Sequence, residues 1–279
     1  MRIIKIQLNQ QRGATLIVVL ILLLLITVIG IIAVRTAITS LNIATNSQIG
    51  QLLMQTSDTP NNQFLNVSNY DVLRAADVVI GAAEMEHRSA PGKEYVFCYK
   101  PTLNQQMAAT MDATILIPPA KNAAKDTKAT IDSTQSNRSG FCDLQRDFGS
   151  AREAVVTQVA VRIPTDTEAV DAGAYLESGV DQGAGSIVQN SKTTSTRVRV
   201  TTTSILPNYS STDLATVQKD CIGDGSSVGY INDALDSDVA GKKTVAECLS
   251  GYGIPVNVQV QEMILQQLDE ETTSPASAW

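Results

Sequence analysis

The sequence predicts an α+β protein in which one long N-terminal helix packs on an antiparallel β-sheet with long loops. Three observations lead to this prediction. The first is an uncharged, largely apolar stretch, Gly13–Val34, near the start of the 279-residue chain. The second is an apolar pattern at spacings of three and four residues that continues from there to Leu53. The third is a change after Tyr95, where apolar and polar residues alternate in short segments typical of strands.

The long helix is expected from Ala14 to about Gln55, within a segment 14–56. Its uncharged part, Gly13–Val34, has 22 residues, which at about 1.5 Å per residue span roughly 33 Å, enough to cross a bilayer core of about 30 Å. Its second half is amphipathic and is expected to pack against the globular domain, residues 57–268. Pro60 and the polar residues before it are expected to end the helix.

A second helix is expected over Asn69–Arg88, with an apolar side that includes Leu73, Val79, Ile80 and Ala83. Five strands are expected after it: Tyr95–Tyr99, Ala113–Ile117, Ala154–Ile163, Thr196–Ile205 and Val256–Gln261.

Two polar stretches, Lys121–Ser139 and Asp181–Thr194, are expected to be surface loops. Residues 269–279 are expected to form a flexible acidic tail.

The four cysteines, Cys98, Cys142, Cys221 and Cys248, all follow the apolar stretch. An even number in an exported domain favours two disulfides, for which three connectivities exist. We favour Cys98 with Cys142 and Cys221 with Cys248, because these pairs close the shorter loops. Zinc is not expected, since the chain has no C-x-x-C pair and a single histidine, His87.

The junction Arg12-Gly13-Ala14-Thr15-Leu16-Ile17 and the apolar run after it resemble the class III leader of type IV pilins and type II secretion pseudopilins. In a secretory signal peptide the small-residue cleavage site follows the apolar stretch, whereas Gly13 precedes it here. The resemblance implies that residues 1–13 are a leader peptide, that a prepilin peptidase cuts between Gly13 and Ala14, and that Ala14 becomes N-methylated. The helix would then pack in the core of a filament.

Val18 lies at the fifth position of the implied mature chain, where most pilins carry glutamate. The absence of this glutamate is typical of PilX-type minor pilins and of the GspK-type tip pseudopilin. The chain resembles the PilX type. A buried carboxylate without a partner costs several kcal/mol. A subunit at the filament tip has no neighbour above it to supply that partner, so Val18 favours a place at or near the tip. The alternative interpretation is that Val18 only faces lipid in an ordinary anchor.

Basic residues precede the apolar stretch, and they place its start in the cytoplasm and the domain beyond the bacterial inner membrane, in the periplasm. Loss of residues 1–13 removes three positive charges and takes the net charge from −7 to −10. An acidic exterior argues against nucleic acid as the main partner.

The resemblance implies partners and a role. The partners are other minor pilins and the major pilin, through the helix, with a tip adhesin as a further candidate. The role is to initiate pilus assembly and present a tip surface for adhesion, twitching motility or DNA uptake. The alternatives are a GspK-like tip pseudopilin of type II secretion and an adhesin domain on a membrane anchor.

No enzymatic motif stands out, because the single histidine disfavours the common triads, and no catalytic residue or cofactor is expected. Four aspartates form a weak candidate calcium site: Asp224, Asp233, Asp236 and Asp238. A solvated acidic loop is the stronger interpretation, since the regular spacing of an EF-hand is absent.

Overall fold

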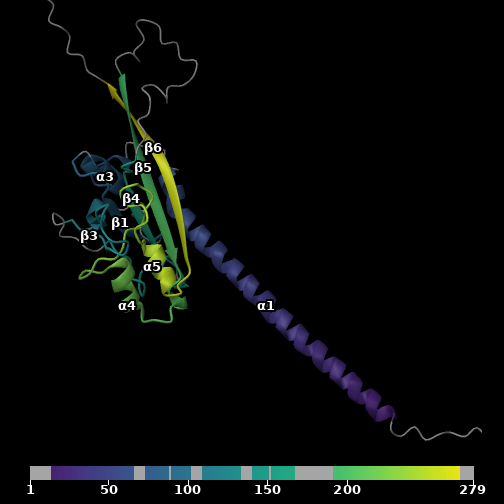
Figure 1. The fold of residues 1–279 in the computed structure, drawn as a ribbon. Coiled ribbons are helices and arrows are strands. Elements are labelled where there is room, and N and C mark those ends of the chain that lie inside the picture. Colours follow the sequence, from purple (N-terminus) through teal and green to yellow (C-terminus); the bar gives the residue numbers. More distant parts are fainter. Residues whose placement is uncertain are drawn as a thin grey trace, which may run out of the picture. The chain divides into compact units, whose positions relative to one another are not determined.

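The computed structural model describes residues 14–65, 73–87, 89–101, 109–132, 140–150, 152–166 and 191–270. Its contacts divide the chain after Gln51 into an N-terminal unit and a domain that begins at Leu52. The domain contains a six-stranded antiparallel sheet with helices on it (Figure 1), which confirms the α+β class.

Helix α1 spans Ala14–Leu65 and passes through Pro60, so the predicted end near Gln55 is wrong. Proline removes one backbone hydrogen bond inside a helix, and contacts with the sheet hold the chain helical despite this loss. Asn257 Nδ2 donates to Ser57 Oγ (2.7 Å), and Thr202 Oγ1 donates to Asn61 Oδ1 (3.0 Å). Phe64 is buried one turn further on. Tertiary packing thus outweighs the local helix-breaking signal.

Helix α3 spans only Val79–His87, which is shorter than the predicted second helix. Val79, Ile80 and Ala83 are buried as expected. The chain before α3 forms turns that pack closely against it, because a Cβ at Gly81 would lie 2.3 Å from the carbonyl oxygen of Ala75. A regular helix could not make that approach.

The sheet has the order β3-β2-β1-β4-β5-β6, with every neighbouring pair antiparallel. The strands are β1 (Glu94–Tyr99), β2 (Thr114–Ile117), β3 (Thr130–Ile131), β4 (Val156–Arg162), β5 (Ser191–Ile205) and β6 (Val256–Glu270). All five predicted strands are present.

One additional strand and two strand ends are the main differences from the prediction. The short strand β3 lies in the stretch that was expected to be a loop, and β5 begins at Ser191, inside the second expected loop. Strand β6 continues through Asp269 and Glu270 because it pairs with β5 over its whole length. Residues 271–279 of the expected tail lie outside the described residues.

The sheet carries a hydrophobic core on each face. On β1, Tyr95 and Phe97 belong to the core formed with α3 and the end of α1, whereas Val96 belongs to the core of the opposite face. That second core includes residues of α4 (Leu214–Val217), the π-helix η4 (Gln218–Ile222) and α5 (Val245–Gly251). Two short 3-10 turns, η1 (Thr110–Asp112) and η3 (Pro207–Tyr209), complete the described elements.

Two disulfides join Cys98 to Cys142 and Cys221 to Cys248, the pairing that the loop lengths favour. The first links β1 to the segment 140–150, and the second links η4 to α5. The first therefore fastens an irregular segment, and the second joins two short helices, within the core on the α5 face of the sheet.

Candidate functional site

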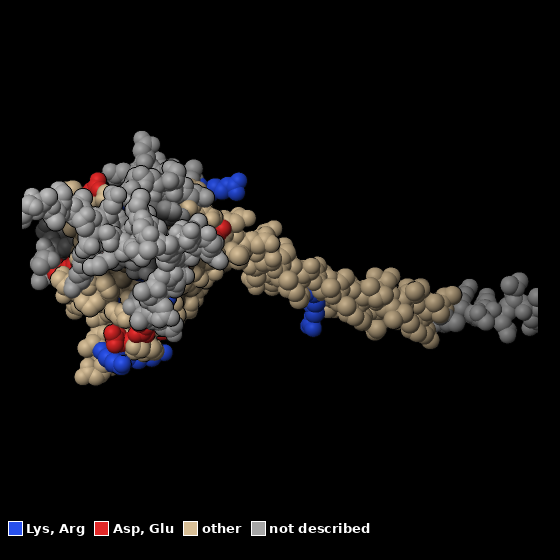
Figure 2. Space-filling view, turned by 90° about the horizontal axis from the view of Figure 1, so that it is seen from above, with Lys and Arg blue, Asp and Glu red and all other residues tan. Residues whose placement is uncertain are grey.

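The first candidate functional surface is the part of α1 before Leu52. This helix is long and apolar enough to cross a membrane, and none of its most apolar stretch is buried inside the protein. Leu16, Val18 and Leu24 are each more than half exposed. Figure 2 shows this helix as almost uniformly tan on the side in view, without the acidic side chains that mark the domain. Such an apolar surface requires lipid or another protein around it.

Four threonine hydroxyls of this helix are adapted to an apolar environment. Thr27 Oγ1 donates to the carbonyl oxygen of Leu24 (2.8 Å), and Thr36 donates to that of Ile32 (3.0 Å). Thr39 and Thr45 make the same bond with carbonyls four residues earlier. These bonds satisfy the hydroxyls within the helix, so that burying them among lipid or other helices leaves no donor unpaired.

The implied leader junction lies at the edge of the described residues. Ala14 is the first residue of α1, and Gly13 lies outside the described residues. Val18 is exposed on the first turns of the helix. Its side chain is therefore available to a neighbouring helix or to lipid.

The structure does not bring the four candidate calcium ligands together. Asp224 Oδ1 accepts hydrogen bonds from the backbone N–H groups of Ser226 and Ser227, each at 2.7 Å. The Ser226 hydroxyl also donates to Asp224 Oδ1. This bond is the largest cause of the lowered pKa of Asp224, about 2, and the two backbone bonds lower it further. Asp238 is exposed, with Lys121 Nζ 4.0 Å away. Asp233 and Asp236 are buried and contact arginine instead, so their charges are already matched.

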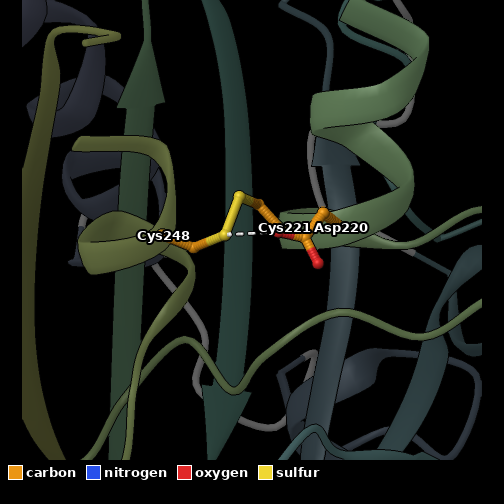
Figure 3. A group of neighbouring side chains, drawn as sticks. All are labelled: Asp220, Cys221 and Cys248. Atoms are coloured by element: carbon orange, nitrogen blue, oxygen red, sulfur yellow. Dashed lines mark hydrogen bonds between the residues drawn. A yellow bond between two sulfur atoms is a disulfide. The ribbon is translucent and has the colours of Figure 1, made fainter. Parts of the chain in front are cut away.

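A different cluster of metal-ligand types, Asp220, Cys221 and Cys248, lies between η4 and α5 (Figure 3). Both sulfur atoms belong to the disulfide, so neither is a thiolate that could bind a metal. The Asp220 carboxylate accepts from Lys128 Nζ (2.9 Å) and from the Tyr252 hydroxyl (3.0 Å). The hydrogen bond from Lys128 is the main cause of the lowered pKa of Asp220. The cluster is thus a hydrogen-bonded support for the disulfide.

A row of four charged residues crosses the sheet on the α5 face, which the sequence analysis missed. Glu94, Arg162, Arg199 and Glu262 occupy paired positions on the neighbouring strands β1, β4, β5 and β6. Arg199 Nη2 lies 2.7 Å from Glu262 Oε1, and Arg162 Nη1 lies 3.9 Å from Glu94 Oε1. The signal in the sequence was the presence of arginines within strands that are otherwise apolar or rich in threonine.

Two further carboxylates complete this charge cluster from the loop that precedes α5. Asp236 bridges the two arginines, 3.1 Å from Arg162 Nη2 and 3.0 Å from Arg199 Nη1. Asp233 lies 2.9 Å from Arg199 Nη1. Glu94 is fully buried and accepts from the backbone N–H of Asn232 (2.9 Å) and of Asp233 (3.1 Å). The cluster therefore fastens this loop to three strands of the sheet, β1, β4 and β5.

The environment raises the pKa values of Glu94 and Arg199 and lowers that of Asp236. Burial raises the pKa of Glu94 and outweighs the opposing effects of Arg162 and Asn232. Burial would also raise the pKa of Asp236, but the Thr165 N–H and the two arginines outweigh it and lower that pKa. For Arg199, burial opposes the charged form, yet the surrounding carboxylates raise its pKa. Arg199 thus remains charged, which fits a structural role.

Comparisons with known proteins give no match: no family model, no curated protein and no solved structure is similar to this chain.

Proposed function

We propose that this chain is a membrane-anchored filament subunit of the type IV pilin and pseudopilin class. Within that class, we propose a minor pilin of the PilX type, at or near the tip of a type IV pilus. It would help to initiate pilus assembly and present a tip surface for adhesion, twitching motility or DNA uptake.

The observation that carries this proposal is the exposed apolar helix directly after Arg12-Gly13. A helix that only anchored a protein in lipid would need about 20 apolar residues. Here the helix continues without a break into the domain and has one charged residue, Arg35, between Ala14 and Gln51. Helices that pack side by side in a filament need such an uncharged surface over a greater length than the bilayer. The threonine hydroxyls that donate to carbonyl oxygens of the same helix support packing in a filament.

The domain is suited to an exported location. One disulfide holds an irregular segment and the other joins two short helices, and disulfides persist outside the cytoplasm. The proposed route begins with a prepilin in the inner membrane and its domain in the periplasm. After processing, α1 would contact other minor pilins and the major pilin, and the domain would face a tip adhesin or the exterior.

The first experiment measures processing of the N-terminus. The full-length protein is expressed with and without a prepilin peptidase, and its intact mass and first residues are determined. We expect a peptidase-dependent loss of residues 1–13 and a methylated Ala14. The matched control is Gly13→Leu, which should retain the leader. A wild-type protein that keeps Met1 in the presence of the peptidase would overturn the proposal, and a signal-anchored adhesin would become the better explanation.

The second experiment tests the place at the tip through Val18→Glu, with Val18→Leu as the matched control. If the protein is at the tip, glutamate at this position is a buried carboxylate without a partner, so the variant should enter fewer initiation complexes and reduce the number of pili. Pili are counted after shearing, and the domain is checked for folding. Unchanged piliation would argue against a tip position, and a defect in protein secretion instead of piliation would identify a type II pseudopilus.

A further inference from the structure

Strand β6 forms one edge of the sheet, and no described strand pairs with its outer side. Its even-numbered side chains include three exposed apolar residues on one face: Val258, Val260 and Ile264. The odd-numbered side chains face the other way, where Met263 and Leu265 are buried and Asn257 contacts α1. Val258 and Val260 therefore lie outside the core, whereas Val256 packs against it.

The same even-numbered residues present their backbone groups to the outer edge. Leu206 N–H donates to the Pro255 carbonyl (3.1 Å), and the β5–β6 pairing then continues residue for residue without a bulge. Hydrogen-bonded pairs alternate along an antiparallel ladder, so the odd-numbered residues of β6 bond to β5. The N–H and C=O groups of Val258, Val260, Glu262 and Ile264 consequently point away from β5.

Among the described residues, the outer edge of β6 shows none of the sequence features that usually block strand addition. Between Val256 and Leu265 there is no proline and no lysine, and Glu262 is the one charged residue. The Glu262 carboxylate is bound by Arg199 (2.7 Å), which matches its charge. Natural edge strands are normally protected by charge, proline, bulges or short length. An edge this long and uncharged is a template for another strand.

We propose that the outer edge of β6, from Val256 to Ile264, accepts one extended, uncharged segment of a different protein by strand addition. The charge of the edge defines this partner, because a charged side chain beside Val258 or Val260 would lose water without gaining a counter-charge. Alternate β-branched residues in the segment would cover the two valines, and the backbone bonds would supply affinity.

A second copy of the chain fits this edge less well. Ser57 of α1 contacts Asn257, and Asn61 contacts Thr202, which pairs with Gln259, so α1 and β6 advance in the same direction. Antiparallel pairing of two β6 strands about a two-fold axis would set the Leu52–Leu65 parts of the two α1 helices in opposite directions. Subunits that pack their helices side by side in a filament, as proposed above, could not pair in this way. The inference that the partner is a different protein rests on the proposed function. The inference that the outer edge of β6 can accept a strand does not.

The test uses the full-length protein in detergent micelles and a synthetic peptide, acetyl-Gly-Ser-Val-Thr-Val-Thr-Val-Ser-Gly-amide. Amide hydrogen exchange is followed by NMR with and without the peptide. We expect the outward amides of Val258, Val260, Glu262 and Ile264 to exchange quickly in the free protein and to slow by about tenfold or more with the peptide. The inward amides should be slow in both states. A peptide with its central valine replaced by proline is the control.

Two variants make the result specific. Val260→Pro removes an outward N–H and should abolish protection by the peptide, while Val260→Thr should retain it. If Val260→Pro is unstable, Val260→Lys serves the same purpose. Outward amides that are already protected in the free monomer, or a peptide that protects none of them, would overturn the proposal. Protection that grows with protein concentration would identify a second copy as the occupant. None of these outcomes depends on leader processing, which tests the proposed function separately.

Discussion

The two parts of helix α1 differ in which side chains they expose and which they bury. Before Leu52 its large apolar side chains point outward and its threonine hydroxyls bond to its own carbonyls. After Leu52 it turns polar groups inward, since Ser57 and Asn61 are buried and bond to the sheet. The first part depends on its surroundings for stability, whereas the second is stabilised by contacts within the domain. A single helix thus serves two environments, and variants in the two parts should have separable effects.

The largest effect on the domain is expected from Arg162→Met, which leaves Glu94 and Asp236 buried without this counter-charge. Breaking a buried ion pair costs about 3–5 kcal/mol, and the free energy of unfolding in denaturant should fall by that amount. Arg146→Met is the matched control, because Arg146 is highly exposed and its ion pair with Asp143 spans 3.8 Å. Equal effects of the two variants would show that the charge cluster does not stabilise the domain.

A slightly smaller effect is expected when the disulfide between η4 and α5 is removed. The double variant Cys221→Ala/Cys248→Ala removes the bond between two cysteines that are 27 positions apart in the sequence. The free energy of unfolding should fall by about 3 kcal/mol. Thermal unfolding under oxidising conditions measures it. Membrane insertion of α1 should be unchanged, and a variant that failed to insert would contradict the independence of the two parts.

Acid should weaken the domain through Asp236. Its pKa is lowered in the folded state, so in acid the unfolded chain binds more protons than the folded one. The stability due to Asp236 is therefore present above its unfolded pKa, about 3.9, and is lost as the pH falls through the folded value. Asp236→Asn should be less stable at neutral pH and should lose less between pH 4 and pH 2, as measured by denaturant unfolding. Asp238→Asn, at an exposed position, should keep the wild-type slope.

The smallest effect is expected from Gly30→Ala in the first part of α1, which should leave the stability of the domain unchanged. A Cβ at Gly30 meets no atom within 4 Å, and alanine favours a helix over glycine by about 1 kcal/mol. Hydrogen exchange of the amides around residue 30 should slow by about fivefold, while the unfolding midpoint of the domain stays the same. A shifted midpoint would mean that the two parts of α1 are coupled.

The sequence was sufficient for features that depend on local patterns. The apolar run predicts α1, and alternation predicts five strands, because neighbouring residues alone determine these patterns. The disulfide pairing also followed from loop length. Pro60 misled the prediction because the contacts that keep it helical come from Thr202 and Asn257, far away in the sequence.

The charge cluster could not be predicted for a related reason. Arg162 and Arg199 become neighbours only through strand pairing, and Asp236 reaches both only because a loop folds over the sheet. The same aspartate was expected among calcium ligands, since a sequence shows the acidic residues of a loop but not the cations that face them. The exposure of Val258 was likewise hidden, because alternation does not reveal which face of a strand packs on α1.

The contact between α1 and the sheet has a mechanical consequence. Because the chain enters the domain through the Leu52–Leu65 part of α1, and this part advances alongside β6, tension along it loads these contacts in shear. Bonds loaded in shear must break together, whereas bonds that are peeled apart break one after another. The load then passes to β5 and β6, which are paired over 15 residues each, so the domain is attached to its helix in a geometry that resists pulling.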